Sequence, residues 1–274
     1  RAGREVGSEG LEKATYIHGT AGPEQARLGR LNELTNRQFV DFLELGETSR
    51  VLEVGSGLGI LAAEVARRVP AGEVIGVEYS PEQLARAESR LPNLRFVRGD
   101  AHALEFEDGR FDVVYCRYVL EHLADPARAL REMRRVLKPG GKVFLQENDI
   151  LASVLYPECP RFEALWRQFA VLQERLGGDA LIGKKLLPLL KAAGFREIVL
   201  SIQPEVHHSG SPGFAAWVEN LVGNVEGAVK ELRAQALATG EEVGRAVAEL
   251  RAWAGRDDSS AFFYWNRARG VRGD

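Results

Sequence analysis

The sequence is poor in the residues that metal centres and disulfide scaffolds require. Its 274 residues include two cysteines, one methionine and five histidines. Cys116 and Cys159 stand far apart, and no cysteine and histidine cluster has the spacing of a zinc site. We therefore expect no metal and no disulfide, and unpaired cysteines are typical of a cytoplasmic protein.

Long apolar runs and an excess of one charge are also missing. No uncharged stretch approaches the roughly 18 residues of a membrane span, and residues 1–10 lack the apolar centre of a signal peptide. The 36 basic and 39 acidic side chains leave a formal net charge of −3. Such a balance creates no general attraction for nucleic acid. We expect a protein without membrane or nucleic-acid partners.

The middle of the chain alternates short apolar runs with helical patterns. Ser80-Pro81 and Asp125-Pro126 each place an N-cap residue before a proline at the first helical position, and Gln83 adds the partner of a capping box. The alternation is typical of a parallel sheet covered by helices. The predicted strands are Val51–Val54, Val74–Glu78, Leu94–Arg98, Phe111–Cys116 and Lys142–Glu147.

Helical patterns dominate the rest of the chain. We predict a helical lid over residues 1–48, a helical insert at about 150–180, and a helical cap insertion over 204–258. The insertion separates two late strands, Phe195–Ile202 and Ala261–Asn266, and is far longer than a hairpin connection. The sheet-forming core is therefore assigned to residues 49–203 and 259–274.

The most informative segment runs from Val51 to Ile60, V-L-E-V-G-S-G-L-G-I. Its glycines let backbone amides approach a ligand at the start of a helix, where an anionic group is favoured. The dinucleotide fingerprint would need glycine where Ile60 stands. Glu53 lies inside an apolar strand, where an unpaired charge costs several kcal/mol. That carboxylate would repel a pyrophosphate but suits a ligand with positive charge beside its own carboxylate.

This run resembles the glycine loop of class I S-adenosylmethionine (SAM)-dependent methyltransferases. Further motifs follow in family order: Glu78, Gly99-Asp100-Ala101, Phe111 to Leu123, and Arg135 to Gly141. The resemblance implies a Rossmann-like, doubly wound α/β sheet of seven strands, mostly parallel with the last antiparallel. It also implies SAM as cofactor and in-line transfer of its methyl group to an O, N or C nucleophile of a small molecule.

The resemblance assigns roles along the cofactor. Glu78 would accept the ribose hydroxyls, Asp100 the adenine amino group, and the amide of Ala101 would donate to the ring. Tyr16 would close over the cofactor from the N-terminal segment. Arg27 would reach the SAM carboxylate, and a solvated helix face is an equal alternative for it. The full set of expected cofactor contacts is Tyr16, Arg27, Glu53, Gly55, Ser56, Gly57, Gly59, Glu78, Tyr79, Gln83, Gly99, Asp100, Ala101, Cys116 and Arg117.

Catalysis needs few residues here, because a thioether leaves easily and alignment of the reactants supplies much of the rate. A base is required only if the acceptor must lose a proton. His122 and Glu147 are the candidates by position, with Asp149 near the same strand end. For His122, capping of the following bend is an equal alternative. His207-His208 is not expected to bind a metal, because adjacent strand residues face opposite ways.

Three alternatives stay open: a non-catalytic SAM-binding protein, a nicotinamide-dependent oxidoreductase, and aminopropyl transfer on the same fold. The sequence names neither the acceptor nor the oligomeric state, for which a homodimer is one option.

Overall fold

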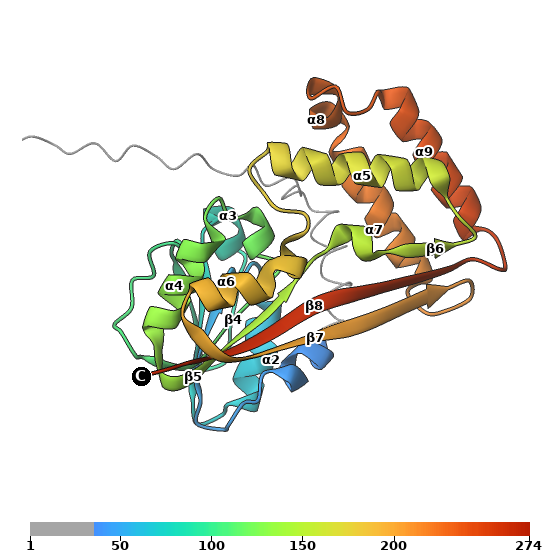
Figure 1. The fold of residues 1–274 in the computed structure, drawn as a ribbon. Coiled ribbons are helices and arrows are strands. Elements are labelled where there is room, and N and C mark those ends of the chain that lie inside the picture. Colours follow the sequence, from blue (N-terminus) through green and yellow to red (C-terminus); the bar gives the residue numbers. More distant parts are fainter. Residues whose placement is uncertain (1–35) are drawn as a thin grey trace, which may run out of the picture.

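An eight-stranded sheet forms the centre of the computed structural model, which describes residues 36–274 (Figure 1). The strand order is β3-β2-β1-β4-β5-β8-β6, and β7 pairs with β8. β1 to β5 are parallel, whereas β8 is antiparallel to β5, β6 and β7. The strands are β1 (Arg50–Val54), β2 (Glu73–Glu78), β3 (Leu94–Arg98), β4 (Phe111–Arg117), β5 (Leu137–Glu147), β6 (Val154–Tyr156), β7 (Phe195–His208) and β8 (Ser260–Arg272).

The predicted α/β class and its antiparallel last strand are confirmed. The structure adds an eighth strand to the expected seven, because β6 pairs with the distal end of β8 inside the region predicted as a helical insert. It also extends β7 beyond Ile202, through Pro204, to His208. Proline lacks a ladder donor and is confined to edge strands, and β7 pairs only with β8 among the described strands. Residues 204–208, assigned to the cap insertion, therefore belong to the sheet.

Helices cover both faces of the sheet. The α-helices are α2 (Ile60–Arg68), α3 (Pro81–Leu84), α4 (Pro126–Val136), α5 (Pro160–Arg175), α6 (Leu186–Ala192), α7 (Phe214–Gly227), α8 (Val229–Ala234) and α9 (Gly240–Ala254), and the 3₁₀ turns are η1 (Leu120–His122), η2 (Ile150–Ala152) and η3 (Ile182–Lys185). Two clusters of buried apolar residues join the helices to the sheet. α4 and α6 contribute to one cluster, and α2 and a helix at 36–42 contribute to the other. Within that second cluster, the Phe39 ring meets the Tyr115 ring edge-on at 5.6 Å.

The two predicted N-caps form, but one differs in detail. Asp125 accepts a hydrogen bond from the Arg128 amide at 2.8 Å and starts α4. Ser80 accepts one from the Gln83 amide at 3.3 Å and starts α3. The Ser80 amide, however, donates to Glu78 rather than to the Gln83 side chain. The expected capping box is therefore incomplete, and α3 ends after about one turn.

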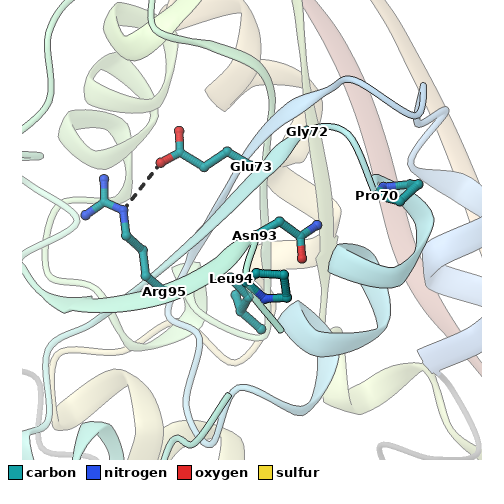
Figure 2. Close-up of a pocket in the computed structure, with 7 residues that line it drawn as sticks. Pro70, Gly72, Glu73, Asn93, Leu94 and Arg95 are labelled. Atoms are coloured by element: carbon teal, nitrogen blue, oxygen red, sulfur yellow. Dashed lines mark hydrogen bonds and ion pairs between the residues drawn. The ribbon is translucent and has the colours of Figure 1, made fainter. Parts of the chain in front are cut away.

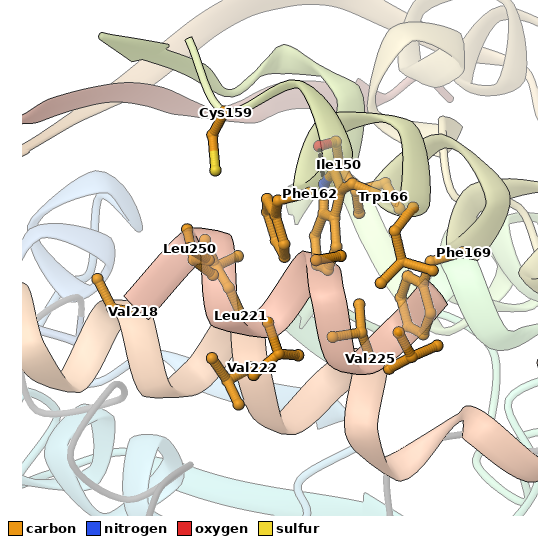
Figure 3. Packing of buried hydrophobic residues seen from close by; sticks show 14 of the residues in the cluster. Ile150, Cys159, Phe162, Trp166, Phe169, Val218, Leu221, Val222, Val225 and Leu250 are labelled. Carbon is orange, nitrogen blue, oxygen red and sulfur yellow. Dashed lines mark hydrogen bonds between the residues drawn. The ribbon is translucent and has the colours of Figure 1, made fainter. Parts of the chain in front are cut away.

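A separate helical layer sits on the distal part of the β7 and β8 pair (Figure 1). α5, α7, α8 and α9 enclose their own apolar core, in which Trp166 lies beside Phe162 and Phe169 (Figure 3). The Trp166 indole donates to the Ile150 carbonyl at 2.6 Å. His207 on β7 stacks on Trp217 of α7 at 5.0 Å. These contacts fix the layer, hereafter the cap, to the sheet.

The amino edge of the sheet carries a depression of about 360 Å³ (Figure 2). It lies where β2 and β3 begin, and Arg95 pairs there with Glu73 at 3.4 Å. Ligands of open α/β sheets bind outside the carboxyl ends of the strands. This depression is at the opposite edge, so it is not the expected ligand site.

Candidate active site

The glycine loop follows β1 at the carboxyl edge. Gly55, Gly57 and Gly59 have φ angles of 76°, 54° and 76°, which side-chain-bearing residues rarely adopt. A Cβ atom on Gly55 would lie 2.4 Å from the Val119 side chain, and one on Gly59 would lie 2.2 Å from the Phe96 ring. Only glycine fits at both positions. Gly59 also caps α2 without a side-chain hydrogen bond. The Ala62 amide in the first turn faces Glu53, whereas the Ile60 and Leu61 amides before it are placed to receive an anionic group.

Glu78 supports this loop from the end of β2. Its Oε2 accepts from the Gly57 amide and its Oε1 from the Ser80 amide, both at 2.8 Å. The carboxylate is 8% exposed. Each oxygen retains a second lone pair for a hydroxyl group. Glu78 thus joins the glycine loop to the segment that carries Tyr79, whose side chain is half exposed.

Glu53 is buried within β1, where its side chain is 4% exposed. Its Oε2 has no hydrogen-bond partner among residues 36–274. Burial raises the pKa of Glu53 to about 8, against the opposing effect of Arg117 and Tyr115. A buried, incompletely paired acid is costly, and a cationic ligand group would relieve that cost. The residues present therefore fit SAM: an incompletely paired acid for its ammonium, and a glycine cradle at the start of α2 for its carboxylate.

The remaining expected cofactor residues lie on neighbouring loops. Asp100 follows β3 and accepts from both the backbone amide and the Nδ1 atom of His102, at 2.8 and 2.7 Å. Burial raises its pKa, but these hydrogen bonds outweigh burial and hold it below the usual value. Gln83 Oε1 faces Gly57 from α3, 3.1 Å from where a Cβ would stand. Ser56 is buried, and its hydroxyl has no partner within the described part of the chain.

Not every expected contact is placed in the same way. Gly99 and Ala101 flank Asp100 in the chain, and Ala101 is buried. Cys116 is fully buried beneath the loop, and its thiol contacts Glu147 at 3.7 Å. Tyr16 and Arg27 lie outside the described residues.

Glu147, at the end of β5, organises the segment after β4. Its Oε1 accepts from the amides of Val119 and Leu120 at 3.1 and 3.0 Å, whereas its Oε2 has no partner within residues 36–274. Burial and the nearby Glu121 carboxylate raise its pKa to about 8. His122 belongs to the same turn, and burial lowers its pKa to about 4. Both candidate catalytic groups are therefore uncharged at neutral pH.

A buried polar row beside this turn was not anticipated from the sequence. Tyr118 has a φ of 58°, and its hydroxyl accepts from the Gln146 side chain at 2.7 Å. Gln146 Oε1 accepts from Arg267 Nε at 2.6 Å. The Tyr118 ring lies 4.5 Å from the Trp265 ring. The signal was present as a glutamine within the predicted strand Lys142–Glu147 and an arginine directly after the predicted strand Ala261–Asn266, but only strand pairing makes them neighbours.

The histidine pair on β7 and other metal-binding side chains stay dispersed. Among residues 36–274, no three metal-binding side chains gather at one place. His207 is buried against Trp217 and the adjacent His208 is exposed, as expected of neighbours on a strand. No helix within those residues is long and apolar enough to cross a membrane.

Comparison with known proteins agrees with this geometry. A family model described as a methyltransferase domain matches residues 52–145. An uncharacterized methyltransferase of Schizosaccharomyces pombe is 42% identical over 123 residues, which cover 41% of this chain and 44% of that protein. The demethylmenaquinone methyltransferase of Deinococcus radiodurans is 38% identical over 163 residues, which cover 54% of this chain and 68% of that protein.

The fold is shared with solved structures as well. The YcgJ protein of Bacillus subtilis superposes with a TM-score of 0.59 at 19% identity, covering 88% of this chain and 99% of that one. The chain spans about half the length of several curated relatives it matches. The glycine cradle, the two carboxylates and the coverage of the Deinococcus radiodurans enzyme lead to one conclusion: the chain belongs to the class I SAM-dependent methyltransferases.

Proposed function

We propose that this protein transfers the methyl group of SAM to a nucleophilic O, N or C atom of a small molecule. The observation that carries the proposal is the pairing of the glycine cradle with an orphaned acid, Glu53, at one strand end. SAM supplies a methyl group on a positively charged sulfur. Glu53 holds the ammonium, Glu78 the ribose and Asp100 the adenine, while the loop amides receive the carboxylate.

The residues around η1 would bind the acceptor and take up its proton. His122 is neutral at pH 7 because burial lowers its pKa to about 4, so its imidazole has a lone pair for the acceptor's proton but acts as a weak base. Glu147 acts through the η1 turn and not on the acceptor itself. Its carboxyl accepts hydrogen bonds from the amides of Val119 and Leu120 and so fixes the position of the turn. This assignment makes His122 the proposed proton acceptor and Glu147 primarily a positioning residue.

The size and charge of the surroundings support a small acceptor. The cap stands on the β7 and β8 pair beyond the sheet edge, as a cover for a substrate would (Figure 1). The net charge of −3 offers no attraction for nucleic acid. Two free, buried cysteines are consistent with a cytoplasmic location. A homodimer is retained as the assembly to be tested by light scattering.

The first experiment identifies the ligand. Mass spectrometry of the purified protein should find SAM or S-adenosylhomocysteine (SAH), and titration should show SAM binding with no comparable binding of NAD(H). Removal of both carboxylates, as Glu53→Gln with Glu78→Gln, should weaken SAM binding more than a hundredfold, because each charged hydrogen-bonding group contributes about 1.5–3 kcal/mol. Unchanged SAM affinity in this double variant would refute the proposed site.

The second experiment tests turnover. Methyl-labelled SAM is incubated with a small-molecule extract, and labelled products are sought. Binding of SAM without label transfer to any acceptor would favour the non-catalytic alternative. Once an acceptor is found, His122→Ala should lower kcat with little change in SAM affinity. Equal losses in kcat and SAM affinity would remove His122 from the catalytic assignment.

A further inference from the structure

A buried arginine on β8 has unused hydrogen-bonding capacity. Arg267 is 7% exposed, and no carboxylate within residues 36–274 lies in ion-pair distance of it. A guanidinium has five N–H bonds. Arg267 donates from Nε to Gln146 and from Nη1 to Gln203, at 2.6 and 3.0 Å. Its Nη2 has no partner among the described residues.

The surroundings of this guanidinium do not neutralise it. Its carbon lies 5.8 Å from the Phe39 ring and 5.0 Å from the Phe42 ring, which attract a cation only weakly. The two glutamine oxygens are uncharged acceptors. Burial, and to a smaller extent the positive charge of Arg117, lowers the pKa of Arg267 to about 10 against an opposing effect of Tyr118, so Arg267 is still charged at pH 7. A buried charge without a partner is costly, so a negatively charged ligand group at Arg267 would relieve that cost.

Strand register places Arg267 level with the start of the glycine loop, three strands away. Gln146 on β5 pairs with Arg117 of β4 on one side and with Arg267 of β8 on the other. The pair next to Arg117 is Cys116 with Val54, so Arg117 stands level with Gly55 at the start of the glycine loop. Neighbouring strands are about 4.8 Å apart, so Arg267 lies about 14 Å, three strand spacings, from the loop. A small molecule spans that distance together with the methionine part of SAM.

Aromatic rings line the same face of the sheet. Trp265 precedes Arg267 by two residues on β8, and its ring contacts the Tyr118 ring at 4.5 Å. Gln203 of β7 pairs with Trp265 and reaches Arg267 from the outer strand. The cap meets this face further along, where His207 stacks on Trp217. Nη2 and the second N–H bond of Nη1 together have the fork geometry that fits a planar carboxylate.

We infer that Arg267, held by Gln146 and Gln203, binds an anionic oxygen group of the methyl acceptor, and that the acceptor is a planar, aromatic or conjugated acid. This inference rests on the proposed function and specifies its substrate class. Arg267 is a substrate-binding residue in this scheme. The reacting atom of the acceptor then lies toward η1 and the glycine loop, on the far side of the acceptor from its acidic group.

Matched pairs of an aromatic acid and its amide test this inference with simple compounds in place of the natural substrate. Benzoic, phenylacetic and 4-hydroxybenzoic acids and their amides are titrated into the SAH-loaded protein, with ligand-observed NMR as the readout. At least one acid should bind about tenfold or more tightly than its amide, since a hydrogen bond to a charged group gives roughly that factor. The preference should fall to about one in Arg267→Met and be reduced in Arg267→Lys, which keeps the charge but loses the fork.

Arg269→Met is the control, because Arg269 lies two residues further on β8 and pairs instead with Glu44 at 2.8 Å. It should retain the preference for the acid. Equal binding of acid and amide by the unmodified protein, or equal effects of the two methionine variants, would overturn the inference. SAH affinity is measured on the same samples. Failure of SAH to bind would count against the proposed function, whereas normal SAH binding without acid preference would count against this inference alone.

Discussion

Binding of SAM should release a proton from the protein, and Glu53 is the expected source. Its pKa of about 8 in the free protein means that about 0.9 of the molecules carry this proton at pH 7. An ammonium placed beside the carboxyl favours its ionised form. Binding should therefore release about 0.9 protons per site at pH 7 and tighten by up to about tenfold per pH unit from pH 6 to 7.

Isothermal titration calorimetry measures this release directly. The observed enthalpy is recorded in buffers of different ionisation enthalpy, and the slope gives the number of protons transferred. SAH should give the same slope as SAM, because both carry the ammonium group. Glu53→Gln should abolish the slope. Glu147→Gln should preserve it, since Glu147 also has a pKa of about 8 but bonds to the η1 turn instead. A zero slope in the unmodified protein, or an unchanged slope in Glu53→Gln, would refute the assignment of Glu53 to the ammonium.

Three further results are expected. The first concerns the dependence of stability on pH. The buried carboxyls of Glu53 and Glu147 keep their protons in the folded state above pH 4.5, so the free energy of unfolding falls as the pH rises toward 8. Burial lowers the pKa of His122 and His207, which has the opposite effect on stability up to about pH 6.5. Urea unfolding should therefore show its steepest loss of stability over about pH 6.5–8, of roughly 2–3 kcal/mol per pH unit at most, and a flat profile there would contradict the burial of both carboxyls. Gly55→Ala should weaken SAM binding at least tenfold. Gly140 has the same φ of 76° but open space around it, so Gly140→Ala should cost only about 1–2 kcal/mol of stability and leave SAM binding unchanged. Equal effects of the two variants on SAM binding would show that the clash at Gly55 is unimportant. Glu249 on α9 accepts hydrogen bonds from two amides at the start of α5, at 2.7 and 3.1 Å. Glu249→Ala should therefore destabilise the protein by about 1–3 kcal/mol in chemical denaturation. No measurable loss of stability would show that these two hydrogen bonds are dispensable.

Local sequence rules predicted the α/β core and the glycine loop after its first strand. The order of strands and helices follows from hydrophobic periodicity, and Asp125-Pro126 starts α4 where expected. Glu53 was recognisable because a lone acid in an apolar strand demands a compensating partner, and the structure leaves its Oε2 without one among residues 36–274. The glycine spacing was informative because positive φ angles at Gly55 and Gly59 are a backbone requirement that only glycine meets easily.

Long-range pairing decided the rest. The length of β7 could not be predicted, because a proline such as Pro204 argues against a strand. The structure shows that β7 pairs only with β8 among the described strands, and an edge strand tolerates proline. The role of Glu147 as a partner of the η1 amides depends on contacts between segments 27 and 28 residues apart. Gln146 and Arg267 are 121 residues apart and become neighbours only through antiparallel register. The sequence by itself determined the backbone cradle and the acid beside it, since both are local properties of one strand and its turn. Only the tertiary structure decided which buried charges lack partners, because burial and pairing are set by elements that meet across the whole sheet.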